Sequence, residues 1–388
     1  MLITAAVTRA PQAPQSIEQI EIGEPRSNEI LVRVVATGIC HTDIAMRDQL
    51  FPVPQPVVLG HEGAGVIEKV GSEITAFEVG DHVVMTYNSC GVCESCVENA
   101  ATYCHEFSRR NFMGARGDGT SALSQDGRLI HGNFFGQSSF ATHAICHGRN
   151  AVKVPRDLPL EMLGPLGCGL QTGAGAVANA LKVGQGKSIA VFGTGSVGLA
   201  AVMAAKAVGA ATIIAVDRHQ PRLDAAIDLG ATHALVGSPD LVDKIKLIRP
   251  LGVHFAIDTT GVPSVIRQAV DSLAPRGECV LLGAAGPTTE ITLRAHHMLS
   301  GGRKVRGVVE GDSDPQTFIP WMIDQHRQGR FPFERLLKFY PLEQISQAMD
   351  DLDSGAAIKP VIRMPADRCS NQQHSTAPRR QLDHEMLP

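Results

Sequence analysis

The chain has 388 residues, of which 44% are hydrophobic, and its formal net charge at pH 7 is −4. This length allows two domains with separate cores and excludes a small scaffold held together by disulfides. No Lys/Arg-rich run stands out, so the charge pattern argues against nucleic acid or an anionic membrane surface as a partner and favours a small molecule.

The N-terminal stretch, MLITAAVTRAPQAPQ, lacks the basic and apolar regions of a secretory signal. The longest apolar run, LAAVMAAKAVGAATIIAV, is interrupted by Lys206 and Gly209, so it is not expected to span a membrane. We therefore expect a cytoplasmic protein. Thiols stay free in that reducing compartment, so clustered cysteines indicate metal ligands rather than disulfides.

Residues 1 to about 160 contain short β-type runs separated by glycine and proline, such as EILVRVVATG, GAGVIEKVG and GDHVVMTY. This pattern predicts a mainly antiparallel, barrel-like domain. We expect its loops to carry two metal sites.

The first metal site is predicted from three stretches: GICHTD with Cys40, LGHEGAG with His61 and Glu62, and GPLGCGLQTG with Cys168. One histidine and two cysteines form the open sphere of a catalytic zinc site, which keeps a fourth position for water or substrate. Each of these residues taken singly would more often be structural. Their combination, in this order and followed by a nucleotide motif, favours a catalytic site.

The second metal site is predicted from CGVCESCVENAATYC, which holds Cys90, Cys93, Cys96 and Cys104 in the pattern C-x2-C-x2-C-x7-C. This spacing lets four thiolates converge on one zinc ion at about 2.3 Å each. A filled sphere leaves no position for substrate, so we expect a structural site. A redox pair at Cys93 and Cys96, or an iron–sulfur cluster, is the alternative.

The stretch KSIAVFGTGSVGLAAVMAAKAVGAATIIAVD predicts a strand, a glycine turn, a helix and a second strand that ends at Asp217. The turn carries G-x-G-x-x-G, where backbone amides and the helix N-terminus hold a dinucleotide pyrophosphate. The residues expected to contact the cofactor there are Gly193, Gly195, Ser196, Val197 and Gly198.

Asp217 is placed to accept hydrogen bonds from the adenosine ribose. Its charge would repel a 2′-phosphate, which favours NAD over NADP, although Arg218 next to it would soften the repulsion.

The segments around ATHALV, VHFAIDTTG and GECVLLGAAG continue the alternation of strands and turns that predicts a doubly wound α/β sheet. We therefore predict a catalytic domain over residues 1–169, a nucleotide domain over 170–308 and a return to the first domain over 309–364, through one amphipathic helix and a closing strand. The cleft between the domains is the expected active site. Residues 365–388, with Cys369, are polar and aperiodic, which predicts a disordered tail.

In this order the motifs resemble the zinc-dependent medium-chain alcohol dehydrogenases over residues 1–364, above all the bacterial aryl-alcohol (benzyl alcohol) dehydrogenases and the related geraniol-type enzymes. The similar stretches are CHTDIAMRDQLFPVPQPVVLGHEGAGV, FFGQSSFATHAI and LGPLGCGLQTGAG. The resemblance implies a Rossmann domain plus a GroES-like catalytic domain, NAD, a homodimer or homotetramer, and two zinc ions per chain at the two sites predicted above.

The resemblance also implies roles that spacing cannot give. Asp43 would orient His61, Thr42 would bind the alcohol hydroxyl and pass its proton on, and Glu62 would be an occasional zinc ligand. Further cofactor contacts would come from Thr172 at the nicotinamide, His41 and Lys359 at the pyrophosphate, and Arg222 at the ribose. The pocket wall would be Tyr87, Phe134 and Phe135. The alternatives are a buried, hydrogen-bonded carboxylate for Glu62, a cap or turn role for the threonines, a solvated charge for His41, Arg222 and Lys359, and core packing for the aromatic rings.

The implied reaction is the reversible oxidation of a primary aromatic or allylic alcohol, of the benzyl alcohol type, to the aldehyde. A geraniol- or perillyl-type terpene alcohol dehydrogenase and a thiol-dependent formaldehyde dehydrogenase are alternatives within the fold, and a non-catalytic nucleotide-binding protein is the alternative from another class. Ala45 stands where many relatives carry a histidine at the end of a proton relay, so the proton must leave by another route.

Overall fold

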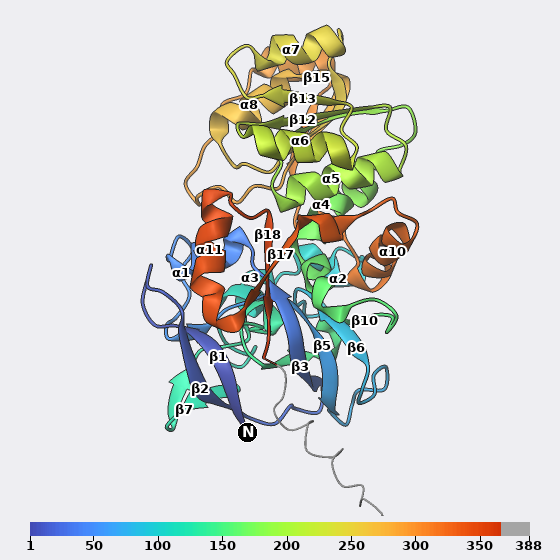
Figure 1. The fold of residues 1–388 in the computed structure, drawn as a ribbon. Helices are drawn as coiled ribbons and strands as arrows, with labels where there is room; N and C mark the ends of the chain where they lie inside the picture. Colours follow the sequence, from blue (N-terminus) through green and yellow to red (C-terminus); the bar gives the residue numbers. More distant parts are fainter. Residues whose placement is uncertain (366–388) are drawn as a thin grey trace, which may run out of the picture.

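The computed structural model describes residues 1–365, and it divides into a parallel-sheet domain and a β-rich domain (Figure 1). The tail predicted after Met364, with Cys369, lies outside the described residues from residue 366 onward. Within the described part, no helix is long and apolar enough to cross a bilayer.

The parallel-sheet domain is built on six strands in the spatial order β13-β12-β11-β14-β15-β16. Their bounds are β11 (Ser188–Phe192), β12 (Thr212–Asp217), β13 (His233–Val236), β14 (Val253–Asp258), β15 (Leu273–Leu281) and β16 (Lys304–Gly307). Every neighbouring pair is parallel. The strand order reverses between β11 and β14, and such a switch point is where open α/β sheets bind ligands. The predicted doubly wound sheet is confirmed.

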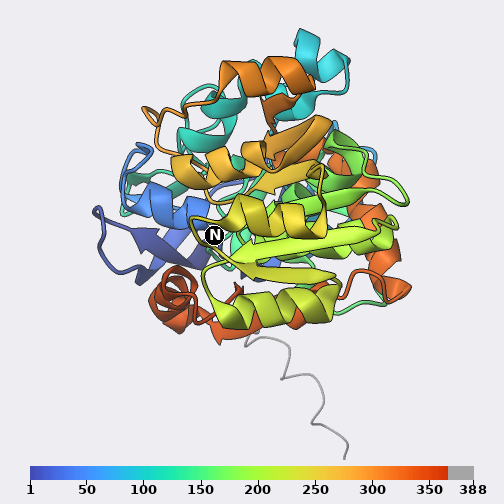
Figure 2. The same ribbon diagram turned by 90° about the horizontal axis from the view of Figure 1, so that it is seen from above.

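Helices cover both faces of this sheet, as its nearly continuous apolar strands require. They are α5 (Ser196–Ala207), α6 (Gln220–Leu229), α7 (Leu241–Ile248), α8 (Pro263–Asp271) and α9 (Ala295–Gly301). In Figure 1, α5 and α6 lie on the face toward the β-rich domain, and α7 and α8 lie on the far face. Seen from above in Figure 2, α7 and α8 are in front of the strands.

Two sheets form the β-rich domain. The first, in the order β4-β1-β2-β7-β8, comprises β1 (Leu2–Thr8), β2 (Ser16–Ile22), β4 (Val57–Val58), β7 (Leu123–Gln125) and β8 (Arg128–Ile130). The second has the order β10-β6-β5-β3-β18-β17, with β9 paired to β3. Its strands are β3 (Glu29–Gly38), β5 (Glu62–Val70), β6 (His82–Met85), β9 (His143–His147), β10 (Ala151–Lys153), β17 (Leu337–Pro341) and β18 (Lys359–Arg363). Apart from the parallel pair β17–β18, these strands run antiparallel, which confirms the predicted barrel-like, mainly antiparallel character.

The α-helices of the β-rich half are α1 (His41–Arg47), α2 (Glu94–Val97), α3 (Phe107–Phe112), α4 (Gly169–Gly175), α10 (Pro315–Arg327) and α11 (Ile345–Ser354). Short 3-10 turns are η1 (Ala101–Tyr103), η2 (Phe134–Gly136), η3 (Gly148–Asn150), η4 (Leu160–Met162), η5 (Gly164–Gly167), η7 (Glu310–Asp312), η8 (Phe333–Leu336) and η9 (Leu342–Gln344), and one π turn is η6 (Ala176–Ala180).

The chain returns to the β-rich domain after the parallel sheet. Strand β18 pairs antiparallel with β3, and α11 lies beside α1 although the two are about 300 residues apart in sequence (Figure 1). The return also includes α10 and β17, in addition to the one helix and one strand that the sequence predicts. The predicted domain limits at 169/170 and 308/309 stay predictions.

A hydrophobic cluster joins the two domains. Val84 of β6 and Leu166 of η5 belong to the same packed group as Val191 of β11 and Leu199 of α5. The domains therefore share a core around α4, which lies between them in sequence and in space.

The return segment should stabilise the β-rich domain. Leu342 of η9 is fully buried in that domain's core, so Leu342→Ala is expected to lower the free energy of unfolding by about 2–5 kcal/mol. The matched control is Leu247→Ala, at an 84% exposed position on α7, for which we expect a change within about 0.5 kcal/mol. Urea unfolding followed by circular dichroism measures both. Equal, small effects would show that the return segment does not contribute to the core.

Candidate functional site

Four predicted metal-site residues meet at the junction of the domains. One ligand atom each from Cys40, His61, Glu62 and Cys168 lies within 4.8 Å of the others. Cys40 precedes α1 and Cys168 precedes α4 as N-cap residues, while Glu62 begins β5 and His61 directly precedes it. The structure thus brings together an imidazole and two thiols, and the thiols are 128 residues apart in sequence.

Asp43 fixes the orientation of the His61 ring. Its Oδ1 lies 2.9 Å from His61 Nδ1, and both side chains are fully buried. Asp43 is itself held by the backbone N–H of Cys40 at 2.9 Å and of Gly60 at 3.1 Å. Burial alone would lower the pKa of His61, but the charge and hydrogen bond of Asp43, together with Cys40, outweigh burial and raise it well above its ordinary value.

The other ring nitrogen, His61 Nε2, is buried and has no hydrogen-bond partner among residues 1–365. A buried polar atom without a partner is costly, and a metal ion between His61, Cys40 and Cys168 would satisfy it. The donor set of two thiols and one imidazole nitrogen suits zinc. The residues present therefore fit the predicted ion.

Glu62 forms a buried ion pair with Lys359. The ammonium donates to both carboxylate oxygens at 2.8 and 2.9 Å and to Ile39 O at 3.0 Å, while Gly169 N donates to Glu62 Oε1 at 3.1 Å. Burial lowers the pKa of Lys359, but the charge and hydrogen bond of Glu62, together with the nearby Cys40 and Cys168, outweigh burial and raise it to about 12. A contact between Lys359 and a pyrophosphate stays a prediction, and the alternative of a solvated surface charge does not hold because Lys359 is fully buried.

A second buried carboxylate, Glu310, was missed by the sequence analysis. Its Oε1 accepts from Cys168 Sγ at 3.5 Å, and its Oε2 accepts from Gln171 Nε2 at 3.1 Å and Thr172 Oγ1 at 3.3 Å. Burial raises the pKa of Glu310 to about 7. The available sequence signal was an acid between two valines and a glycine in VVEGD, which marks a turn but gives no partner.

Another missed residue is Gln137, whose side chain bonds the backbone on both sides of Glu62. Its side chain donates to His61 O at 2.9 Å and accepts from Gly63 N at 3.1 Å. No motif in the sequence indicates this role.

Aromatic rings surround His61. Phe135 stacks on the imidazole with ring centroids 4.4 Å apart, and Phe134 meets it edge-on at 5.5 Å. Phe112 and Phe107, neither of which the sequence singled out, pack edge-on against Phe135 at 5.2 and 6.5 Å.

Tyr87 lies at the edge of this group. It packs on Phe107 at 5.8 Å, and its hydroxyl donates to Ser313 O at 2.8 Å. Two of the predicted wall residues, Phe134 and Phe135, therefore contact His61, and Tyr87 is connected to them through Phe107. The contact of all three with substrate stays a prediction.

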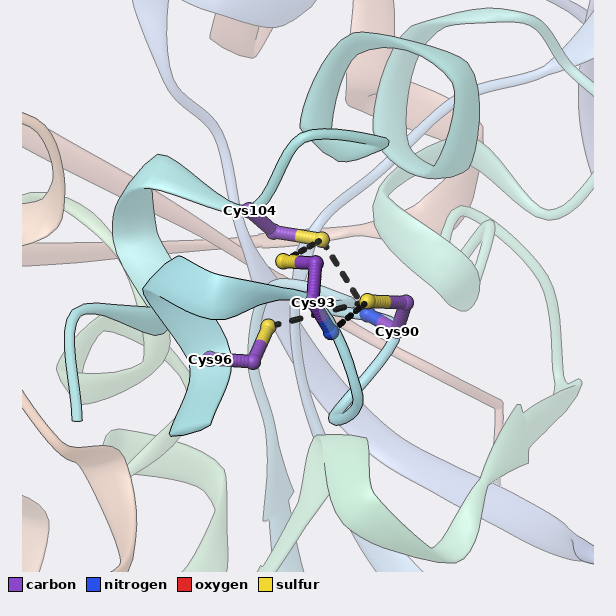
Figure 3. A group of neighbouring side chains, drawn as sticks. All are labelled: Cys90, Cys93, Cys96 and Cys104. Atoms are coloured by element: carbon purple, nitrogen blue, oxygen red, sulfur yellow. Dashed lines mark hydrogen bonds between the residues drawn. The ribbon is translucent and has the colours of Figure 1, made fainter. Parts of the chain in front are cut away.

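The four clustered cysteines converge in a lobe of the β-rich domain (Figure 3). The Sγ atoms of Cys90 and Cys96 are 3.8 Å apart and those of Cys93 and Cys104 are 4.0 Å apart. A tetrahedron of thiolates at about 2.3 Å from one zinc ion has edges of about 3.8 Å. All four ligand atoms lie within 4.8 Å of one another, which leaves room for one ion and not for a cluster of several iron atoms.

Backbone amides in the four-cysteine lobe donate hydrogen bonds to the Cys90 sulfur, which favours its thiolate form. Val92 N and Cys93 N donate to Cys90 Sγ at 3.4 and 3.2 Å; burial opposes ionisation of this thiol, but these donors lower its pKa to about 6. All eight cysteines among residues 1–365 are free thiols. The donor set therefore fits a closed zinc site.

The three glycines of the dinucleotide turn differ in what surrounds them. Gly193 has φ +89°, a left-handed conformation that favours glycine. A Cβ on Gly198 would lie 1.9 Å from Gly193 O, so the helix packs against the turn without room for a side chain, whereas a Cβ on Gly195 would meet nothing within 4 Å. Open space at the middle glycine is where a pyrophosphate would approach the backbone.

Asp217 ends β12 beside this turn. Its carboxylate accepts from Thr194 N at 2.7 Å, Thr194 Oγ1 at 2.9 Å and His219 N at 3.0 Å. Burial raises the pKa of Asp217, but these hydrogen bonds outweigh burial and lower it below its usual value. The group therefore carries a negative charge at neutral pH.

The remaining predicted residues lie around the junction. His41 and Arg218 are exposed, and Arg218 Nε donates to His219 Nε2 at 2.9 Å. Thr42 Oγ1 lies 3.6 Å from Cys40 Sγ. Arg222 reaches across from α6 toward Gly355 after α11, since a Cβ on Gly355 would lie 2.8 Å from its guanidinium. Their roles toward a cofactor or substrate stay predictions.

Comparison with known proteins gives consistent matches over nearly the whole chain. Two family models match: the alcohol dehydrogenase GroES-like domain over residues 26–156 and the zinc-binding dehydrogenase domain over residues 196–324. Geraniol dehydrogenase of Castellaniella defragrans is 45% identical, with 92% of this chain and 96% of that protein covered. S-(hydroxymethyl)glutathione dehydrogenase of Escherichia coli is 34% identical over 92% of this chain and 99% of that one.

Among solved structures, benzyl alcohol dehydrogenase from Acinetobacter calcoaceticus is similar with a TM-score of 0.92 and 46% identity, covering 94% of this chain and all of that one. An alcohol dehydrogenase zinc-binding domain protein from Burkholderia ambifaria has a TM-score of 0.93 and 53% identity at the same coverage.

The two cysteine clusters should lose metal independently. Cys168→Ser and Cys96→Ser are each expected to remove about one zinc ion per chain, measured by elemental analysis. Cys96→Ser should also lower the melting temperature, because a closed site contributes folding energy, whereas Cys168→Ser should leave it nearly unchanged.

The control is Cys279→Ala, a buried thiol outside both clusters, which should keep the full zinc content. Unchanged zinc in Cys168→Ser would show that this cluster is not a metal site.

Proposed function

The chain belongs to the zinc-dependent alcohol dehydrogenase family, and we propose that within this family it oxidises primary aromatic or allylic alcohols, of the benzyl alcohol type, to aldehydes with NAD, reversibly. The roles of the site residues given below are part of this proposal.

One observation carries the proposal: the metal cluster and the dinucleotide turn meet at Gly169. A Cβ at this position would lie 3.3 Å from Glu62 Oε1, 3.4 Å from Lys359 Nζ and 3.7 Å from Ser196 Oγ. The N-terminus of α5, where a pyrophosphate would bind, is therefore next to the residues beside the open metal site. Hydride transfer requires this closeness, because the nicotinamide ring and the carbinol carbon must come into contact.

Cys40, His61 and Cys168 would hold the zinc ion, which when bound polarises an alcohol oxygen and lowers the pKa of its hydroxyl. NAD, when bound, accepts the hydride. Asp43 keeps the proton of His61 on Nδ1, so that Nε2 presents its lone pair to the metal.

Thr42 Oγ1, 3.6 Å from Cys40 Sγ, would accept a hydrogen bond from an alcohol at the metal site and would relay the proton by passing on its own hydroxyl proton. Ala45 offers neither donor nor acceptor, so the proton leaves without using residue 45. Thr172, held by Glu310, would orient the nicotinamide.

The surroundings of His61 support an apolar, planar substrate. Phe134 and Phe135 exclude water from the imidazole and present rings to the site. Such a surface suits a benzyl or allylic group, including a terpene alcohol such as geraniol, better than the charged thiol conjugate of a formaldehyde dehydrogenase. The charge of Asp217 supports NAD over NADP, since a 2′-phosphate would approach a carboxylate that stays ionised.

We also propose a cytoplasmic homodimer or homotetramer. The free thiols of residues 1–365 support a reducing compartment. The edge strand β16, with Leu299 83% exposed nearby, supports pairing with a second copy, because an unpaired edge readily adds another strand.

Two glycine variants test the cofactor site. Gly195→Ala adds a methyl group in open space at an unstrained φ of −72°, so the protein should remain stable while NADH binds about tenfold or more weakly. Gly198→Ala is the contrast: its methyl group overlaps Gly193 O, so stability should fall by about 1–3 kcal/mol. NADH fluorescence titration and thermal unfolding measure the two effects. Wild-type NADH affinity in Gly195→Ala would place the pyrophosphate elsewhere.

The reaction is tested by steady-state formation of NADH, and of NADPH from NADP, with benzyl alcohol, geraniol and ethanol on protein of known zinc content. We expect kcat/KM to be higher for both large alcohols than for ethanol, with benzyl alcohol first and NAD preferred to NADP. Preference for geraniol would shift the proposal to a terpene alcohol. Turnover only in the presence of a thiol and formaldehyde would contradict it, and full zinc with no turnover of any substrate would favour a non-catalytic role.

A further inference from the structure

Glu310 lies on a turn in an unusual backbone conformation between the two domains. The turn η7 follows β16 and precedes α10, and Glu310, Gly311 and Asp312 have φ values of +48°, +68° and +50°. Only glycine adopts the left-handed region without penalty, so two of these residues are held there against their own preference. Backbone strain of this kind persists where the surrounding contacts over-determine the position, and it clusters at functional sites.

The contacts around the turn explain how its left-handed backbone conformation is held in place. Gly311 packs so closely on α4 that a Cβ would lie 2.5 Å from Gln171 O, and a Cβ on Gly175 would lie 2.5 Å from Gly311 O. Asp312 accepts from Tyr103 of the four-cysteine lobe at 2.6 Å and from Arg306 of β16 at 2.8 Å. The turn is therefore attached to α4, to the lobe and to the parallel sheet at once.

The side chain of Glu310 uses this fixed position to contact one turn of α4. Its carboxylate accepts hydrogen bonds from Gln171 and Thr172, the third and fourth residues of that helix, and from the thiol of Cys168 at the N-cap. The hydrogen bonds from Gln171 and Thr172 remain when the Cys168 sulfur binds a metal as a thiolate. Cys168 belongs to the metal cluster, and Thr172 is the proposed nicotinamide contact. One carboxylate thus connects the metal side and the cofactor side of the site.

We propose that Glu310 is a positioning residue for hydride transfer: it holds the first turn of α4 through Gln171 and Thr172, and so fixes the Thr172 hydroxyl and the Cys168 sulfur at the N-cap of that turn in the relative arrangement that the nicotinamide and the metal require. This inference rests on the proposed function. It predicts that the side chain affects kcat more than substrate binding, since it acts on the alignment of the reacting groups. It also predicts that the sulfur of Cys168 changes its environment when the carboxylate is removed.

The test compares Glu310→Ala with Glu310→Gln. Glu310→Ala should lower kcat about tenfold or more at unchanged zinc content, with a smaller change in KM for the alcohol. Glu310→Gln keeps an oxygen for Gln171 and Thr172 and a second polar atom near Cys168, so it should restore kcat to within about threefold of wild type. With cobalt at the Cys40–His61–Cys168 site, Glu310→Ala should shift the sulfur-to-cobalt charge-transfer band, and Glu310→Gln should return it toward wild type.

The control is Asp312→Asn, which loosens the same turn at a carboxylate that faces Tyr103 and Arg306 instead of α4. It should lower the melting temperature, leave kcat within about twofold of wild type and leave the cobalt band in place. The proposal is overturned if Glu310→Ala and Asp312→Asn lose kcat in proportion to their loss of stability. It is also overturned if Glu310→Ala loses zinc but keeps a normal kcat per bound ion, or if the cobalt spectrum of Glu310→Ala is unchanged.

If the wild-type protein oxidises no alcohol, the proposed function fails. The cobalt spectra of the same three variants then still decide whether Glu310 positions Cys168.

Discussion

The absence of side chains at three glycines of one helix is the constraint on which the rest of the structure depends. Helix α4 approaches three different neighbours through glycine: Gly169 meets the Glu62–Lys359 pair, Gly173 meets Val197 O, and Gly175 meets Gly311 O. At Gly173 and Gly175 a Cβ would lie at 2.0 and 2.5 Å from these atoms. Close backbone packing of this kind has little tolerance, so α4 fixes the metal cluster, the dinucleotide helix and the Glu310 turn relative to one another.

The junction also concentrates buried charge. The side chains of Asp43, Glu62, Lys359 and Glu310 are all buried around the same two thiols. Removing a charge from water costs several kcal/mol, and partners recover that cost only when the geometry is good. Lys359 is such a partner for Glu62. For Asp43 the partners are the backbone N–H groups of Cys40 and Gly60 and the ring nitrogen Nδ1 of His61. The junction therefore concentrates this cost in one place, beside His61 Nε2, which has no hydrogen-bond partner among residues 1–365. Such a concentration is typical of a functional site.

Local pattern was sufficient to predict much of the fold. The run EILVRVVATG coincides with β3, and the glycine turn separates β11 from α5 as its spacing requires. Strand β16 was missed because four residues with exposed ends give no alternation to recognise, and α10 because Pro320 stands inside the helix. The residues of both metal clusters could be named from residue type and order, whereas Glu310 could not. Its partners lie 138 to 142 residues earlier in the chain, and no local rule connects an acid in a turn to a helix at that separation.

The position of β18 has a consequence for the order of synthesis. Strand β3, in the middle of the larger sheet of the β-rich domain, pairs with a strand that leaves the ribosome more than 320 residues later. Every strand of the parallel sheet lies between them, so that domain is complete while the first one still lacks a central neighbour. Until Lys359 emerges, Glu62 has no cation beside it. The nascent chain therefore carries its metal-binding thiols in an unfinished domain for most of its translation, and the last strand of residues 1–365 is the one that completes that domain.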